Sequence, residues 1–156
     1  MTARNSPEPL ELTLVRVFAA PRHLVFQCWT DPKHIVHWLA PHGFTIPLAE
    51  GELKPGGRWR STMVKPDGTE LKLGGTYKQL VRDELIVMTH AWDTPQDEAG
   101  QETLITVRFE DAGPGKTRMT FTQTGFASKE DREGHAGGWG ECFERLDSHI
   151  KKGAKP

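Results

Sequence analysis

One long amphipathic segment near the C-terminal end, from Ser128 to Lys152, constrains this chain more than any other feature. Its apolar side chains recur at spacings of three and four residues, the period of a single helix face: Trp139, Cys142, Phe143, Leu146 and Ile150. Ser128 followed three residues later by Asp131 is typical of a helix start, and Gly153 is typical of a helix end. The sequence therefore predicts one long terminal helix with one apolar face.

Four glycines fall in the first half of this predicted helix: Gly134, Gly137, Gly138 and Gly140. Each glycine in a helix interior costs about 0.8–1.0 kcal/mol relative to alanine. We therefore expect the first turns to be weak, bent or non-helical. Beside His135 and Trp139, such a segment would either gate a cavity or pack closely against a sheet.

Most of the chain before this helix has the alternation of antiparallel strands. We expect strands at 10–18, 44–53, 58–64, 71–81, 85–92, 104–110 and 117–124, separated by turns rich in glycine and proline. Two short helices follow the first strand, one opened by Pro21 and one running from Asp31 to Pro41. The order predicts an α+β protein in which one curved antiparallel sheet of about six to seven strands wraps around the terminal helix.

Local irregularities in the strands carry further expectations. In the first strand the apolar side chains shift from even-numbered to odd-numbered positions at Val15, which indicates a bulge or burial on both faces. Pro47 places the second strand at a sheet edge, because proline cannot donate to a strand ladder. Gly74 and Gly75 indicate a bulge or a close backbone approach.

Composition bounds the class of protein and its partners. A chain of 156 residues is long enough for one domain, which we assign to residues 10–153 after a flexible N-terminal arm at 1–9. The twenty basic and twenty-one acidic side chains nearly cancel, so the chain lacks the excess positive charge of proteins that bind nucleic acid or an anionic membrane. No run of residues is apolar enough for a membrane span or a signal peptide, so we expect a cytoplasmic protein. Cys28 and Cys142 are then expected to be buried free thiols.

Recognisable catalytic and metal motifs are absent from the sequence. Gly115-Lys116-Thr117 lacks the earlier glycine and the strand-to-helix setting of a phosphate-binding loop. His34, His37 and His42 cluster, but we see no nearby cysteine and no carboxylate at a suitable spacing, so we predict no metal site. No cofactor is predicted either.

The aromatic residues suggest an internal cavity. Five tryptophans occupy apolar positions of the predicted elements, and a sheet wrapped on one helix leaves space at its open end. We expect the cavity between the sheet and the terminal helix to be lined from the following candidates: Trp38, Trp59, Arg60, Tyr77, Met88, His90, Trp92, Phe121, Gln123, His135 and Trp139.

Several segments resemble one known family. The opening VRVFAAPRHLVFQCWTDPKHIVHWLAP resembles the first strand and paired helices of the START-like, or SRPBCC, superfamily. KPGGRWRSTMVKPDG, GGTY, LIVMTHAW and HAGGWGECFERLDSHI resemble its branch of homologues of the activator of the ninety-kilodalton heat-shock chaperone's ATPase. The resemblance covers about residues 10 to 152. It implies a helix-grip fold, in which a curved sheet grips the C-terminal helix around a hydrophobic cavity.

Three functions are compatible with these observations. The first is binding of a small hydrophobic or amphipathic molecule between the sheet and the terminal helix, since the superfamily includes proteins that bind lipids, hormones and polyketides. The second is a cyclase or hydrolase that uses His90 or His135 as general acid or base. The third is a protein-interaction module, as a homodimer or a chaperone partner.

Overall fold

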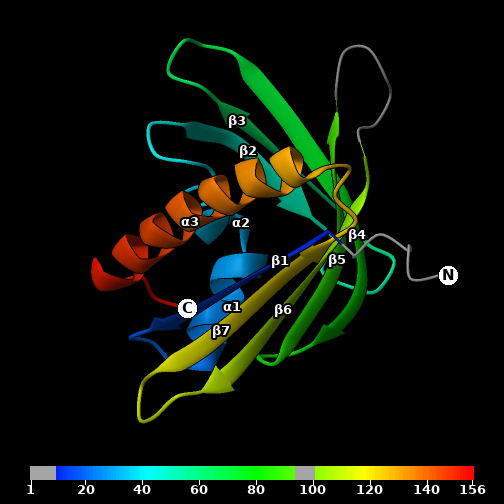
Figure 1. Cartoon of the computed structure of the whole chain (residues 1–156). Coiled ribbons are helices and arrows are strands. Elements are labelled where there is room, and N and C mark those ends of the chain that lie inside the picture. The colour runs from blue at the N-terminus through cyan, green and yellow to red at the C-terminus, as the bar shows by residue number, and fades with distance from the viewer. Residues whose placement is uncertain (1–9, 94–100) are drawn as a thin grey trace, which may run out of the picture.

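A curved, seven-stranded antiparallel sheet with a long helix lying across one face forms the framework of the protein (Figure 1). The computed structural model describes residues 10–93 and 101–156. The elements in chain order are β1 Glu11–Phe18, α1 Arg22–Thr30, α2 Pro32–Ile35, β2 Thr45–Gly51, β3 Arg58–Val64, β4 Glu70–Val81, β5 Leu85–Asp93, β6 Thr103–Asp111, β7 Thr117–Thr124 and α3 Lys129–Lys151. The predicted α+β class and the helix-grip arrangement are confirmed.

The strand order is β1-β7-β6-β5-β4-β3-β2, so β2 to β7 form a meander and β1 closes the far edge against β7. The two short helices α1 and α2 connect the two edge strands, β1 and β2. Pro47 lies in the edge strand β2 as expected, and the pairing of β2 with β3 is irregular between Thr45 and Leu48.

The bulge expected in β1 is absent. β1 pairs with β7 in an unbroken register from Glu11 to Phe18. Its inward positions begin with the buried Leu12 and end with the buried Phe18, whereas Val15 and Val17 are 47% and 54% exposed. The expectation was wrong because valine also suits the exposed face of a strand, so an apolar residue there does not mark a change of phase.

The glycine pair in β4 marks a close approach of two backbones. A methyl group at Gly75 would collide with the carbonyl oxygen of Thr89 on β5. The register of β4 against β5 shifts later, between Tyr77 and Gln79. Of the two alternatives, the close approach is therefore correct at Gly74 and Gly75, and the bulge lies a few residues further on.

The terminal helix α3 runs without interruption from Lys129 to Lys151 (Figure 1). The Ser128 hydroxyl accepts a hydrogen bond from the Asp131 amide at 3.0 Å, as the N-cap pattern predicts. Of the three expected alternatives, weak, bent or non-helical first turns, the non-helical one is wrong. The propensity cost of glycine is small beside the packing of a whole apolar helix face, which includes Trp139, Phe143 and Leu146.

The second short helix ends earlier than expected, at Ile35, and turns carry the chain through Trp38 and Leu39. Both side chains are nevertheless buried. Residues from α1, α3 and the inner sheet face meet in a single core, whose most deeply buried members include Phe18, Val25, Trp38, Ile86, Ile105, Val107, Phe109, Met119, Phe121, Phe143 and Leu146. Among the described residues, none of the helices combines the length and apolarity needed to span a membrane.

Candidate functional site

A pocket of about 400 Å³ lies between the N-terminal half of α3 and the strands β3, β4 and β5. Its walls are mainly apolar, and its described lining residues are Leu39, Pro41, Phe44, Met63, Leu71, Leu73, His90, Trp92, Glu130, Asp131, Gly134, His135, Gly138, Trp139 and Cys142. Successive strand residues point to opposite faces, so Leu71 and Leu73 share the inner face of β4. Trp139 contributes from the apolar stripe of α3.

The glycines of α3 help to shape this pocket. Gly134 and Gly138 belong to its lining. A methyl group at Gly134 would have no neighbouring described atom within 4 Å, and one at Gly138 would reach only the Pro41 ring at 4.0 Å. Close packing against the sheet therefore does not account for these two glycines, and their missing side chains leave room in the pocket.

Two histidines lie next to each other in the pocket lining, His90 from β5 and His135 from α3, with ring centroids 6.0 Å apart in an edge-to-face arrangement. His90 is only 3% exposed. Its burial, followed by the proximity of His135, lowers the pKa of His90 from 6.5 to about 3. The His90 imidazole is therefore neutral at physiological pH.

Both ring nitrogens of His135 make hydrogen bonds within the protein. Its Nδ1–H donates to the carbonyl oxygen of Asp131 at 2.8 Å, and its Nε2 accepts from the indole of Trp92 at 3.1 Å. These two bonds assign one neutral tautomer to the ring. His135 thus fixes the position of Trp92 at the pocket wall.

Gln123 is held in a buried chain of hydrogen bonds below the pocket. Its Oε1 accepts from the Trp139 indole at 2.9 Å, and its Nε2 donates to the Thr103 hydroxyl at 2.8 Å. The Thr103 hydroxyl in turn donates to the carbonyl oxygen of His90 at 3.1 Å. The chain connects α3 to β7, β6 and β5, so Gln123 positions the pocket wall rather than facing a ligand.

A loop that forms one side of the pocket is tied to α3. The Arg145 guanidinium donates to the carbonyl oxygens of Ala40, Pro41 and Phe44 at 3.0, 2.9 and 3.1 Å. Glu141 accepts from the backbone amide of His42 at 3.0 Å. These contacts fix Pro41 and Phe44, two of the lining residues, against the helix.

The structure places the predicted site residues in three groups. The pocket brings together His90, Trp92, His135 and Trp139. A second void of about 20 Å³, enough for about one water molecule, is lined in part by Trp59, Arg60, Tyr77 and Met88. Leu39, Leu73 and Trp139 line both spaces. Trp38, Phe121 and Gln123 lie in the core and line neither space.

In the second group, Arg60 makes an ion pair and Tyr77 has a shifted pKa. Arg60 lies on the outer face of β3 and pairs with Glu50 at 2.8 Å. Burial raises the pKa of Tyr77 to about 12. Neither side chain lines the larger pocket.

Sequence reasoning missed most of the apolar lining, including Met63, Leu71 and Leu73. Their period-two spacing places them on the same sheet face as Trp59, and that signal could have identified them. The contributions of Leu39, Pro41 and Phe44 depend on how the loop folds against α3, which no local pattern encodes.

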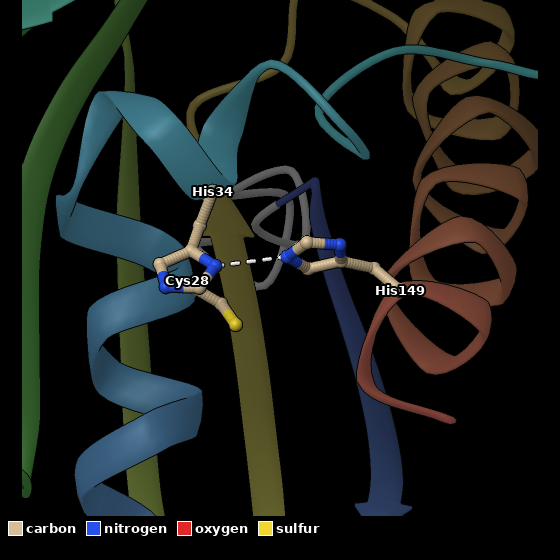
Figure 2. A group of neighbouring side chains, drawn as sticks. All are labelled: Cys28, His34 and His149. Atoms are coloured by element: carbon tan, nitrogen blue, oxygen red, sulfur yellow. Dashed lines mark hydrogen bonds between the residues drawn. The ribbon is translucent and has the colours of Figure 1, made fainter. Parts of the chain in front are cut away.

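The histidines near α2 have neighbours that sequence proximity did not reveal. His34 Nδ1 lies 2.8 Å from Nε2 of His149, in the last turn of α3, and Cys28 of α1 lies beside them (Figure 2). The expectation that no cysteine lies near these histidines was wrong. The prediction of buried free thiols is confirmed for Cys28 and Cys142, and burial raises the pKa of both to about 12.

Comparison with known proteins agrees with this architecture. The model of the family described as "Activator of Hsp90 ATPase homolog 1-like protein" matches residues 19–151. A search of the curated proteins found no match.

Solved structures with the same fold come from several bacteria. The AHSA1 protein of Silicibacter pomeroyi is 23% identical, with a TM-score of 0.82 over 92% of this chain and 99% of that one. A protein of Arthrobacter aurescens is 23% identical, with a TM-score of 0.83 over 94% and 88%. A protein of Chromobacterium violaceum is 24% identical, with a TM-score of 0.78 over 88% and 95%. At these identities the likeness concerns the fold alone.

Proposed function

The chain belongs to the family of Activator of Hsp90 ATPase homolog 1-like proteins, and from this premise we propose that it binds a small apolar or amphipathic molecule between α3 and the sheet. The proposal is carried by the pocket of about 400 Å³ and its apolar walls. Ligand sites commonly measure about 300–1,000 Å³ and combine apolar walls with a few polar groups. Affinity would come from burial of apolar surface, at about 25 cal/mol per Å².

The polar groups around the pocket favour one kind of ligand head group. The described lining residues include the acidic Glu130 and Asp131 but no lysine or arginine. The indoles of Trp92 and Trp139 add aromatic faces, which attract cations. We therefore propose an apolar ligand body in the interior and a neutral or cationic head at the rim, rather than a carboxylate.

A matched pair of helix variants tests whether the pocket is the binding site. Gly138→Leu would place a side chain in the pocket, whereas Gly137→Leu makes the same change at the exposed position beside it. A neutral hydrophobic probe such as N-phenylnaphthylamine should gain fluorescence with the wild-type protein and with Gly137→Leu. We expect affinity to fall at least about tenfold in Gly138→Leu, since filling the site removes apolar burial worth more than about 1.4 kcal/mol.

Equal probe binding by both variants would contradict the proposal. Circular dichroism and urea unfolding of each variant provide the control, because a partly unfolded protein also binds hydrophobic probes.

The head-group preference is tested separately with two ligands of one chain length. Below their micelle concentrations, a long-chain amine should displace the probe more strongly than the corresponding fatty acid. Glu130→Gln should reduce that preference, because it removes one rim charge. A stronger effect of the fatty acid would overturn the preference for a cationic head and leave apolar binding intact.

The geometry supports the two alternative functions, catalysis and protein interaction, less well than it supports ligand binding. A histidine whose pKa is about 3 is a weak general base near neutral pH, and His135 already uses both ring nitrogens. A protein-interaction module requires a contiguous apolar surface. The exposed Val15 and Val17 instead lie opposite Thr120 and Arg118 of β7. A homodimer or a chaperone partner thus remains a weaker proposal than a small-molecule ligand.

A further inference from the structure

We propose that Cys28, His34 and His149 form a binding site for a transition metal ion of the Zn²⁺ type. The site is separate from the pocket described above. His149 and His135 are four turns apart along α3, a distance of about 21 Å at 1.5 Å per residue. None of the three residues belongs to the described pocket lining.

Three separate helices bring the ligand atoms together. Cys28 comes from α1, His34 from α2 and His149 from the last turn of α3. One ligand atom from each residue lies within 4.8 Å of the other two. Figure 2 shows the two imidazole rings pointing toward each other with the Cys28 sulfur beside them. The cluster therefore results from tertiary packing and has no counterpart in a local spacing motif.

The observed separations range from 2.8 Å between the two imidazole nitrogens to no more than 4.8 Å within the cluster, so an ion would draw the longer ones in by up to about 1.2 Å. With bonds of about 2.0–2.1 Å to nitrogen and about 2.3 Å to sulfur, tetrahedral zinc holds its ligand atoms about 3.3–3.6 Å apart. The 2.8 Å between His34 Nδ1 and His149 Nε2 must widen by about half an ångström. Small rotations of the side chains would achieve this, because the His149 ring is only half-buried.

One side of the cluster is accessible from solvent. His34 is 8% exposed and Cys28 is fully buried, but the His149 ring stacks at 4.8 Å on the exposed ring of His37. An ion could enter from this side, and a water molecule could supply a fourth ligand there. Three protein ligands with an open fourth position are one of the arrangements in which zinc occurs.

The ligand types select the class of ion. One cysteine sulfur and two imidazole nitrogens favour borderline-soft ions such as Zn²⁺, whereas Mg²⁺ and Ca²⁺ require oxygen ligands. Without an ion, the two facing imidazoles share one hydrogen bond, because one ring nitrogen must donate and the other accept.

The test uses the full chain without an affinity tag. After removal of metal by a chelator, we expect isothermal titration with Zn²⁺ to give one equivalent per chain and thermal unfolding to shift to higher temperature. Co²⁺ should give the intense visible bands of a tetrahedral site together with a sulfur-to-cobalt charge-transfer band. The charge-transfer band should be lost in Cys28→Ala and retained in His149→Gln.

Matched variants decide whether these residues hold the ion. Zn²⁺ affinity should fall at least about tenfold in Cys28→Ala and in His149→Gln, since loss of outer-shell partners alone costs 10–100-fold. Cys142→Ala and His42→Gln change the other buried cysteine and a surface histidine, and should leave the affinity unchanged. If Cys28→Ala does not fold, the affinity of His149→Gln and the cobalt spectrum of the wild type still decide whether these residues hold the ion. Absence of stoichiometric Zn²⁺ binding, or equal affinity in His149→Gln and His42→Gln, would overturn the proposal.

Discussion

At the scale of single residues, the tryptophans show how polar atoms organise an apolar interior. All five indole N–H groups donate hydrogen bonds, to the Met119 sulfur, to backbone oxygens of Cys28 and Thr89, and to the side chains of His135 and Gln123. A buried indole without a partner would lose the hydrogen bond that it makes with water in the unfolded chain. The ring positions are therefore fixed by specific acceptors as well as by packing.

Sequence patterns located these rings but could not identify their partners. Each tryptophan occupies an apolar position of a predicted element, which is a local property. The acceptor for Trp139 is Gln123, which lies on β7, a different element. Gln123 was predicted as a cavity residue, but its amide faces the Trp139 indole and the Thr103 hydroxyl. The direction of such a side chain depends on packing between elements.

Replacing Gln123 with leucine should destabilise the protein by about 1–3 kcal/mol, because the Trp139 indole and the Thr103 hydroxyl lose buried partners. The measurement is the free energy of unfolding in urea. Gln79→Leu at an exposed position of β4 provides the control and should change it by less than about 0.5 kcal/mol. Similar effects of the two substitutions would show that the buried chain of hydrogen bonds contributes little.

At the scale of elements, α3 shows that a long apolar stripe outweighs local propensity. Its existence, its start at the Ser128 cap and its end near Gly153 all follow from sequence signals. The continuity of α3 through its four glycines does not follow from sequence signals, because the contacts that stabilise it come from the sheet and from α1. Apart from α3, the observed strand boundaries agree with those predicted from the alternation to within a few residues, and β3 and β7 agree at both ends.

Gly137→Ala should stabilise the protein by about 0.8–1.0 kcal/mol, since a methyl group there meets no described atom within 4 Å. Gly75→Ala is the contrasting change and should destabilise by about 1–3 kcal/mol or more, because its methyl group would collide with the Thr89 carbonyl oxygen. Both effects are measured as shifts of the urea unfolding midpoint. A destabilised Gly137→Ala variant would show that α3 requires the flexibility of glycine at that position.

At the scale of the whole molecule, the curvature of the sheet and the path of the 40–44 loop determine where space remains. The pocket forms where the glycine-bearing half of α3 faces β3, β4 and β5. Arg145 holds the loop over its side through three carbonyl oxygens. The resulting environment buries His90, and this burial makes the stability of the whole fold depend on pH.

Stability should fall as the pH is lowered from about 7.5 to about 5, because His90 has a folded-state pKa of about 3 against 6.5 when unfolded. Between these pKa values the unfolded chain binds more protons, so the contribution is complete above about pH 6.5 and declines below it. The urea midpoint at both pH values measures the effect. In His90→Phe the decline should be smaller than in the wild-type protein. An unchanged decline would show that His90 is not its source.

The sequence alone determined the α+β class, the strand and helix order and the capped terminal helix, because alternation, helical spacing and turn residues are local and repeat along the chain. The family followed from the resemblance of several segments to known members, and the family model matches residues 19–151. It also proposed His90, Trp92, His135 and Trp139 as cavity candidates, and these four residues line the same pocket. Only the tertiary structure decided that Gln123 points into the core and that Cys28 meets His34 and His149. These contacts join residues on different elements. Their geometry depends on how the sheet curves and where α3 crosses it, and neither property is encoded in any single segment.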